Sequence, residues 1–546
     1  MALVNGGQLL TKSLLHQGTE IIFFIEGDPF LKAQRFLAKE PIRLLDVRHE
    51  QAAAMMAHAY ARVTGGKPGV CMAAAGPGVT NLVTGVANAF SDCAPVVVLG
   101  GSFPTRESDM GAFQELDQLN MMRPITKWAV KAPTTQRIPE YLELAFRTAT
   151  SGRPGPVYLD LPLDVLSAEV EEDKVNFPGH YPAPARPMGD PDLITRAIEL
   201  LSKAQRPVLL TGSGIIWSGA SEQLREFVDT VGIPFFTTPQ GRGVIPEDHP
   251  LCLPSARNFA LRNADVILVV GTRLNFVFTF GRAPRFDPAV KVIQVDIQPE
   301  YISHNRPVDV GIAGDAKMVL GQLIQEARGK ISGWAESPWL SKLKDMESQH
   351  QAKSKHLLES DQVPIHTARL CKEVRDFIPR DAVLAVDGNE ILTWARQIIN
   401  TNVPGHRMNC GPFGCLGVAV PFGIGAKLGK PGAPVFVLSG DGSFGFNGME
   451  MDTAIRHKIP IVVIISNNGS WASMSHDENV PGKYLGHQRY DLMVSAFGGY
   501  GELVEHPRDI RPALERAVAS GKPACLNVIT DTYVKSHQSG LLHYEA

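Results

Sequence analysis

The sequence predicts an α/β protein with three open parallel-sheet domains, and three observations support this fold class. Short runs of β-branched and apolar residues alternate with helix-length segments, as is typical of parallel strands joined by crossover helices. A length of 546 residues is more than one hydrophobic core usually supports. Two stretches without apolar periodicity divide the chain, so we expect domains at about 1–172, 190–330 and 365–546.

In the first domain, a helix is expected near Gln8–His16, where Leu10 and Leu14 share one face and Gly18 follows the end. A longer, alanine-rich helix is expected from about Gln51 to Val63 and is closed by two glycines. Five apolar runs are expected to be strands: Ile21–Ile25, Ile42–Val47, Gly69–Ala73, Val96–Leu99 and Val157–Leu161.

Residues 172–190 are rich in proline and are expected to be a linker, and 330–364 a partly helical connection. Strands are expected in the second domain near Pro207–Thr211, Val266–Gly271 and Val292–Asp296. In the third domain they are expected near Ala382–Val386, Val435–Ser439, Ile461–Ser466 and Cys525–Thr530.

The overall composition argues against several kinds of partner. The formal net charge is only -3, with acidic and basic residues mixed, so we expect neither nucleic-acid binding nor a basic protein partner. The apolar runs are of strand length, and the N-terminus lacks a secretory signal, so we expect a cytoplasmic protein without a membrane span. The seven cysteines are scattered without CxxC spacing and are expected to be reduced core thiols.

The third domain carries the strongest chemical signal. Asp441 comes directly after an apolar strand and lies between Gly440 and Gly442, whose missing side chains permit close approach to a ligand. Asn468 lies just past the next apolar strand, so adjacent parallel strands would bring its amide oxygen beside Asp441. Hard oxygen ligands of this kind suit Mg²⁺, which prefers phosphates and few protein ligands.

This GDG…NN pair resembles the motif of thiamine-diphosphate enzymes, and the likeness extends over nearly the whole chain. The resemblance implies that Asp441 and Asn468 are metal ligands through their side chains and Ser470 through its carbonyl, with Ser443 beside the diphosphate. It also implies that the three domains are a pyrimidine-binding, a central nucleotide-binding-like and a diphosphate-binding domain.

Glu50 resembles the activating glutamate of the family, which hydrogen-bonds N1′ of the aminopyrimidine and promotes formation of the thiazolium ylide. By the same resemblance, the Gly414 carbonyl receives the 4′-amino group, and Leu416 enforces the bent cofactor conformation, although many relatives have Met there. In the family, the glutamate and the GDG loop come from different subunits. A homodimer or homotetramer is therefore implied.

Within the family, the segment from Met110 to Glu115 resembles the corresponding segment of the 2-hydroxyacyl-CoA lyases. Oxalyl-CoA decarboxylases tend to carry a Tyr-Glu pair at the position of Phe113–Gln114. The implied reaction is reversible cleavage of a 2-hydroxyacyl-CoA to formyl-CoA and an aldehyde or ketone, through the ylide. The alternatives are oxalyl-CoA decarboxylase, a benzaldehyde lyase-like carboligase, an acetolactate synthase-like enzyme with FAD, and an inactive assembly subunit.

Several further residues are candidates for this chemistry. Gln114 can polarise the substrate hydroxyl, and three side chains are candidate acids or bases: His49, His476 and Glu478. Arg396 and Arg407 are candidate partners for the phosphates of CoA, and the last residues, from Tyr533, are a candidate lid. An ADP is implied in the central domain, where a GSG turn follows a strand and four residues match the family's nucleotide site: Arg153, Arg273, Asp296 and Asp315.

Overall fold

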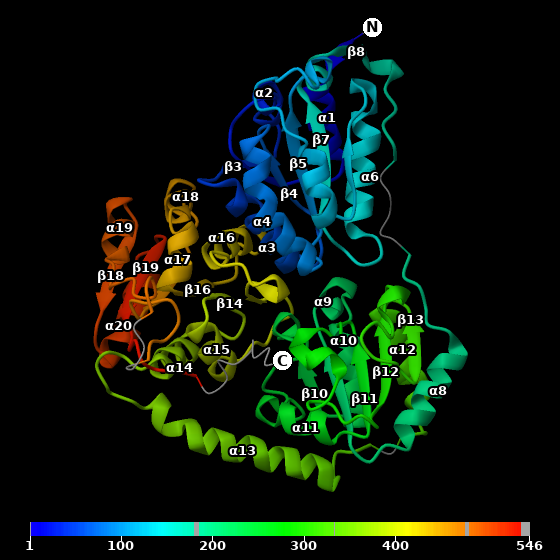
Figure 1. Cartoon of the computed structure of the whole chain (residues 1–546), viewed down its shortest axis with the longest axis vertical. Coiled ribbons are helices and arrows are strands. Elements are labelled where there is room, and N and C mark those ends of the chain that lie inside the picture. Colours follow the sequence, from blue (N-terminus) through cyan, green and yellow to red (C-terminus); the bar gives the residue numbers. More distant parts are fainter. Residues whose placement is uncertain (1, 180–184, 332, 476–479, 537–546) are drawn as a thin grey trace.

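Three α/β domains make up the computed structural model, which describes residues 2–179, 185–331, 333–475 and 480–536 (Figure 1). Each domain contains one parallel sheet, and the three sheets lie inside the three predicted ranges. The predicted fold class is therefore confirmed, while the domain limits themselves stay predictions.

The N-terminal sheet has the order β3-β2-β4-β5-β7-β6, and all its pairs are parallel. Its strands are β2 (Ile21–Phe24), β3 (Arg43–Asp46), β4 (Gly69–Ala73), β5 (Val96–Ser102), β6 (Ala129–Lys131) and β7 (Val157–Pro162). The helices are α1 (Gly6–His16), α2 (Leu31–Leu37), α3 (Glu50–Val63), α4 (Pro77–Ser91), α5 (Gln118–Met122), α6 (Ile138–Thr150) and α7 (Leu163–Ser167). A small antiparallel pair, β1 (Leu3–Asn5) with β8 (Glu169–Glu171), joins the two ends of the domain.

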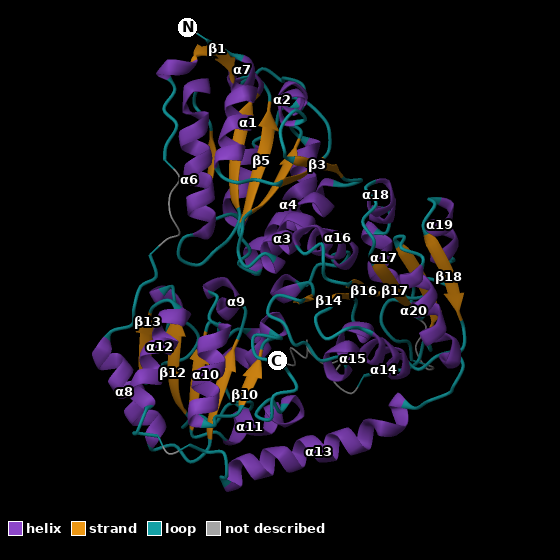
Figure 2. Ribbon diagram, turned by 180° about the vertical axis from the view of Figure 1, so that it is seen from behind, coloured by secondary structure: helices purple, strands orange, loops and turns teal. Residues whose placement is uncertain are grey.

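The central sheet has the order β10-β9-β11-β12-β13. Its strands are β9 (Pro207–Thr211), β10 (Phe235–Thr237), β11 (Val266–Val270), β12 (Lys291–Asp296) and β13 (Val310–Ala313). The helices are α8 (Pro191–Ser202), α9 (Gly214–Ser218), α10 (Ser221–Val231), α11 (Arg257–Asn263) and α12 (Ala316–Ala327). The long helix α13 (Pro338–Leu358) runs beneath the central and C-terminal domains in Figure 2, where a partly helical connection is expected.

The C-terminal sheet has the order β15-β14-β16-β17-β19-β18. Its strands are β14 (Val383–Asp387), β15 (Arg407–Met408), β16 (Val435–Gly440), β17 (Val462–Asn467), β18 (Tyr500–Val504) and β19 (Ala524–Ile529). The helices are α14 (Thr367–Phe377), α15 (Glu390–Ile398), α16 (Ala419–Gly429), α17 (Asp441–Asn447), α18 (Glu450–Arg456), α19 (Tyr490–Ala496) and α20 (Ile510–Ala519).

Every predicted strand is present, and the differences lie at the edges. Seven strands were not predicted, namely β1, β6, β8, β10, β13, β15 and β18, and all of them lie at a sheet edge or in the two-stranded pair. Such strands bury little apolar surface, so their sequences carry a weak periodic signal. The long helix also begins at Glu50, one residue earlier than predicted, because His49 caps it.

The N-terminal and C-terminal domains share one continuous hydrophobic core, in which α3 packs against α16. The contact is close because α16 presents glycine: a Cβ on Gly425 would lie 2.3 Å from the carbonyl oxygen of Met56. Within one chain, this packing fixes the start of α3, which carries Glu50, relative to β16 and β17, the strands that precede Asp441 and Asn468.

Two further expectations concern the whole chain. All seven cysteines are free thiols, but only four lie in the core as predicted, because Cys252, Cys410 and Cys415 are partly exposed. Among the helices of the described ranges, none combines the length and the apolar character that a bilayer span requires.

Candidate active site

Asp441 and Asn468 follow two neighbouring parallel strands of the C-terminal sheet, as the sequence predicts. In the register of β16 and β17, Gly440 is paired with Ser466, so both strands end at the same edge of the sheet. Asp441 then begins α17, while residues 468–470 form a turn in which Gly469 has a φ of +68°. The spacing of 27 residues is therefore accounted for by one strand-helix-strand unit.

The Asp441 carboxylate is buried and only partly satisfied. Burial raises its pKa to about 6, against the lowering effect of the amides of Gly442, Gly469 and Ser470. Its Oδ2 atom has no hydrogen-bond partner among the described residues. Because a buried, unpaired carboxylate oxygen is costly, this atom fits a cation as its missing partner.

The turn after β17 supplies further oxygen atoms beside Asp441. The side-chain oxygen of Asn468 accepts a hydrogen bond from the backbone N–H of Ser470 at 3.3 Å, and its amide group donates to Ala472 O at 2.8 Å. Ser470 is buried, as is Ser443 on the first turn of α17. A Cβ on Gly442 would lie 2.7 Å from the Trp471 ring, so glycine at this position allows the ring to pack closely. The donor set fits a magnesium-bound diphosphate.

Glu50 is the first residue of α3 and is buried. Its Oε2 atom accepts a hydrogen bond from Asn81 of α4 at 2.9 Å. Asn81 was not predicted as part of the site. A Cβ on Gly78, in the first turn of α4, would lie 3.5 Å from Glu50 Oε1. Gln114 lies close to the same end of α4. A Cβ on Gly76, which precedes the helix, would lie 2.8 Å from the carbonyl oxygen of Gln114. The structure thus places Glu50 and Gln114 around one end of α4.

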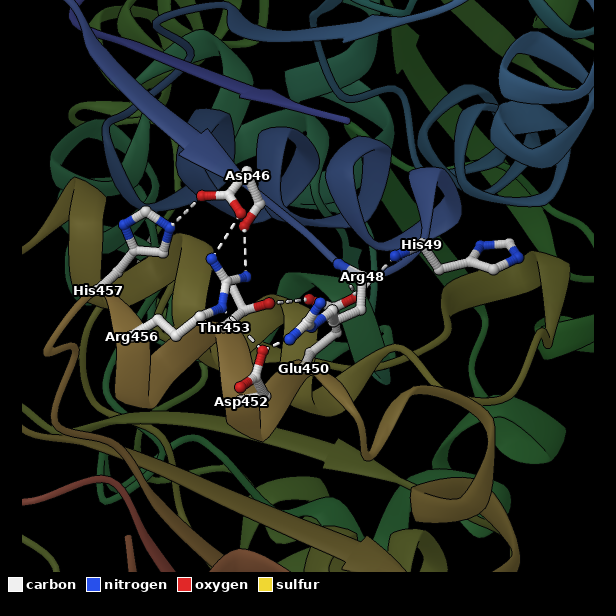
Figure 3. A network of polar contacts seen from close by, with 8 residues as sticks. All are labelled: Asp46, Arg48, His49, Glu450, Asp452, Thr453, Arg456 and His457. Atoms are coloured by element: carbon white, nitrogen blue, oxygen red, sulfur yellow. Dashed lines mark hydrogen bonds and ion pairs between the residues drawn. The ribbon is translucent and has the colours of Figure 1, made fainter. Parts of the chain in front are cut away.

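The turn that precedes Glu50 is held by the C-terminal domain (Figure 3). Glu450, the first residue of α18, accepts hydrogen bonds from the backbone N–H groups of Arg48 at 3.0 Å and His49 at 3.1 Å. Its other oxygen accepts from the Thr453 hydroxyl at 2.7 Å. Glu450 is fully buried, and burial raises its pKa to about 7.

Ion pairs surround Glu450 and join the same two segments (Figure 3). Asp452 pairs with Arg48 across the domain boundary at 2.5 Å and with Arg456 on its own helix at 2.8 Å. Asp46, at the end of β3, pairs with both Arg456 and His457. This network could not be predicted from the sequence, because its two halves are about 400 residues apart.

A large cavity of about 1260 Å³ connects the three domains. Its lining includes Gly414 and Leu416, the residues that the resemblance places against the aminopyrimidine. The lining also includes the four residues expected around a nucleotide, Arg153, Arg273, Asp296 and Asp315, and we call this part of the cavity its central end. Neither Glu50 nor Asp441 lines it.

The four residues of the central end hold one another and their neighbours in place. The Arg153 guanidinium stacks on the Tyr301 ring at 3.7 Å and lies 3.6 Å from Asp296. Burial raises the pKa of Asp296 despite these charges. Asp315 caps α12 and accepts a hydrogen bond from the Ser218 hydroxyl at 2.9 Å, so it also has a structural role. Arg273 donates to the carbonyl of Ser91 at 2.7 Å.

The remaining candidates have different outcomes. Arg396 lines the cavity, whereas Arg407 is fully buried and does not line it. His49 is exposed, and its Nδ1 atom accepts from the Gln51 amide, so it serves as the cap of α3. His476 and Glu478 lie outside the described residues, as do residues 537–546 of the expected lid.

Comparisons with known proteins agree with this geometry. Three thiamine pyrophosphate enzyme models match the chain: the N-terminal TPP binding domain at residues 4–121, the central domain at 194–323 and the C-terminal TPP binding domain at 389–528. The chain is 36% identical over 538 residues to a probable acetolactate synthase of Mycobacterium bovis, covering 97% of this chain and 96% of the relative. It is 34% identical over 548 residues to oxalyl-CoA decarboxylase of Escherichia coli strain K12, with coverage of 97% and 96%. It is 32% identical over 550 residues to human 2-hydroxyacyl-CoA lyase 1, with coverage of 97% and 95%. The chain therefore belongs to the thiamine pyrophosphate (thiamine diphosphate) enzyme family and is a thiamine-diphosphate-dependent carbon–carbon lyase.

Proposed function

We propose that this enzyme reversibly cleaves a 2-hydroxyacyl-CoA into formyl-CoA and an aldehyde or ketone. The observation that carries the proposal is the cavity of about 1260 Å³ that begins at Gly414 and Leu416. A cavity of this size exceeds the usual 300–1,000 Å³ of a small-molecule pocket and suits a large, CoA-linked substrate. The Phe113–Gln114 pair, in place of Tyr-Glu, favours a lyase over a decarboxylase.

Arg396 supports an anionic, CoA-linked substrate. Burial lowers its pKa to about 10, and the charges of Arg257 and Arg242 act in the same direction. Among the described residues, the charges that act on its pKa are the cations Arg257 and Arg242 and the thiol of Cys410, and no carboxylate is among them. A partly desolvated cation without a counterion attracts a negatively charged group, and the phosphates of CoA are such groups.

The residues of the site divide the work as follows. Asp441, Asn468 and the Ser470 carbonyl would hold the Mg²⁺ ion that accompanies the diphosphate. Bound thiamine diphosphate supplies the nucleophile and the electron sink that carbon–carbon cleavage requires. Glu50 holds a proton at the aminopyrimidine, with Asn81 fixing its carboxylate at 2.9 Å. Gln114 hydrogen-bonds the hydroxyl of the substrate, and the apolar part of the cavity excludes water.

We further propose that the active enzyme is a homodimer or a homotetramer. Glu50 does not line the cavity that Gly414 and Leu416 reach within one chain. Several apolar side chains near the diphosphate loop are also exposed, namely Phe413 (47%), Phe446 (56%) and Met449 (50%). A second copy packed on this face would cover them and bring its own Glu50 to the site.

The central end of the cavity suits an ADP as a structural or regulatory ligand. Arg153 and Arg273 supply positive charge for phosphates, and Asp296, at the end of β12, can accept hydrogen bonds from ribose hydroxyls. Isothermal titration with ADP checks this part of the proposal by itself. Binding that survives in an Arg153→Ala, Arg273→Ala variant would contradict it.

The test of the reaction is a direct assay. Purified protein, Mg²⁺ and thiamine diphosphate are incubated with a panel of 2-hydroxyacyl-CoAs of different chain length, and formyl-CoA is measured by liquid chromatography. We expect formyl-CoA from at least one member, and none from a Glu50→Gln variant. Release of CO₂ from oxalyl-CoA, without formyl-CoA from any 2-hydroxyacyl-CoA, would overturn the lyase proposal in favour of the decarboxylase.

A second candidate is an acetolactate synthase-like reaction, which the 36% identity to a probable acetolactate synthase favours. That candidate expects FAD rather than ADP at the central end of the cavity. The two are distinguished by colour, since bound FAD makes the purified protein yellow. A colourless protein that releases formyl-CoA supports the first proposal.

A further inference from the structure

A buried polar cluster at the junction of the three domains contacts the loop that begins at Cys410. We define the junction cluster as His58 and Arg62 of α3, Asn88 and Asp92 at the end of α4, and Gln240 of the central domain. All five are at most 8% exposed. None of them belongs to the predicted site, and burying so many polar groups is costly unless each has a partner.

Asn88 connects the cluster to the loop. Its amide group donates a hydrogen bond to the Cys410 carbonyl at 2.8 Å. Its side-chain oxygen faces His58 Nδ1 at 3.1 Å, and His58 Nε2 faces the Asp92 carboxylate at 3.0 Å. The two ring nitrogens of His58 therefore connect Asn88 to Asp92.

Asp92 completes the contact on the other side of His58. Burial alone would raise its pKa, but the hydrogen bond from His58 and the charge of Arg62, 3.5 Å away, hold the pKa below its ordinary value. The next residue of the loop packs directly on this carboxylate and on Gln240. A Cβ on Gly411 would lie 3.5 Å from Asp92 Oδ1 and 2.9 Å from Gln240 Nε2, and Gly411 has a φ of +59°.

We propose that Asn88, supported by His58 and Asp92, is a positioning residue for the 410–416 loop and thereby for the aminopyrimidine of thiamine diphosphate. The loop is short, and Gly414 and Leu416 lie only four and six residues after the carbonyl that Asn88 holds. Fixing its first residues from a rigid helix restricts where these two can lie. This inference rests on the proposed cofactor role of the loop.

The test distinguishes binding of the pyrimidine end of the cofactor from binding of its diphosphate end. An Asn88→Asp variant keeps the size of the side chain and an acceptor for His58, but it replaces the donor to Cys410 by a repelling oxygen. Binding of thiamine diphosphate and of inorganic diphosphate, each with Mg²⁺, is measured by isothermal titration calorimetry on the full-length protein. Inorganic diphosphate reports on Asp441 and Asn468 alone, because it lacks the pyrimidine.

We expect the variant to bind inorganic diphosphate like the unmodified protein and thiamine diphosphate at least tenfold more weakly. Unchanged affinity for both ligands would overturn the proposal, as would an equal loss of both, which would indicate general unfolding. A Leu14→Ala variant, which removes a core side chain remote from the loop, serves as the control for destabilisation. If the unmodified protein bound neither ligand, the cofactor role itself, and not only the positioning role, would be wrong.

Discussion

Glu450 offers a sharp test of how the C-terminal domain holds the start of α3. In a Glu450→Gln variant, the side-chain oxygen can still accept from the amides of Arg48 and His49, and the new NH₂ group can donate to Thr453. The substitution therefore keeps the three contacts and removes only the ionisable group. A Glu450→Ala variant removes all three contacts.

The magnitude follows from the pKa. Burial raises the pKa of Glu450 from 4.5 to about 7, so the folded protein holds this proton more tightly than the unfolded chain. Its contribution to stability is fully present below about pH 4.5 and is lost as the pH rises to about 7. At about 1.36 kcal/mol for each pKa unit, the loss is roughly 3 kcal/mol.

The assay compares apparent melting temperatures of the unmodified protein and the Gln variant between pH 5 and pH 8, at one scan rate. As the pH rises, the melting temperature of the Gln variant should increase relative to that of the unmodified protein. For a stability loss of this size, the total change in this difference is about 5 °C. The alanine variant should melt lower than the Gln variant at every pH, because each lost hydrogen bond costs about 1 kcal/mol. A difference between unmodified and Gln proteins that does not change with pH would refute the reasoning.

Three other predictions follow from single contacts. An Asp441→Asn variant keeps the shape of the side chain but loses the negative charge proposed to face the cation. Calorimetry should therefore show at least a tenfold weaker affinity for thiamine diphosphate with Mg²⁺. Equal affinity would argue against metal ligation. An Arg396→Gln variant should raise KM for the acyl-CoA at least tenfold with little change in kcat, and an unchanged KM would remove Arg396 from the CoA site. A Gly425→Ala variant places a methyl group against the Met56 carbonyl and should destabilise by about 1–3 kcal/mol in a thermal melt. Gly432→Ala, which has open space around the new methyl, should melt like the unmodified protein.

The core of the fold could be predicted from the sequence, because the central strands are fully buried and appear as continuous apolar runs. Val462–Asn467 is an example, and the positions of Asn468 after it and of Asp441 after Val435–Gly440 follow from the rule that parallel strands end at one edge. β18, with the sequence YGELV, lies at a sheet edge and carries polar and glycine residues, so it gave no clear pattern.

Contacts between distant segments could not be predicted in the same way. Glu450 and His49 are separated by 401 residues, and Asn88 and Cys410 by 322. In the sequence, Glu450 resembles any glutamate at a helix start, where its negative charge interacts favourably with the helix dipole. Only the packing of α3 on α16 reveals that it accepts from the turn before Glu50. The residues that hold the site are therefore harder to predict than the residues that form it.

Subunit mixing shows whether Glu50 of one chain acts with Asp441 of another, as we propose. A Glu50→Gln chain and an Asp441→Asn chain should each be inactive as homo-oligomers. After unfolding, mixing in equal amounts and refolding, half of the dimers are mixed, and one of the two symmetric sites in each contains both native residues. The formyl-CoA assay should then recover about a quarter of the activity of refolded unmodified protein. No recovery, from chains that refold into mixed dimers, would contradict a site shared between two chains.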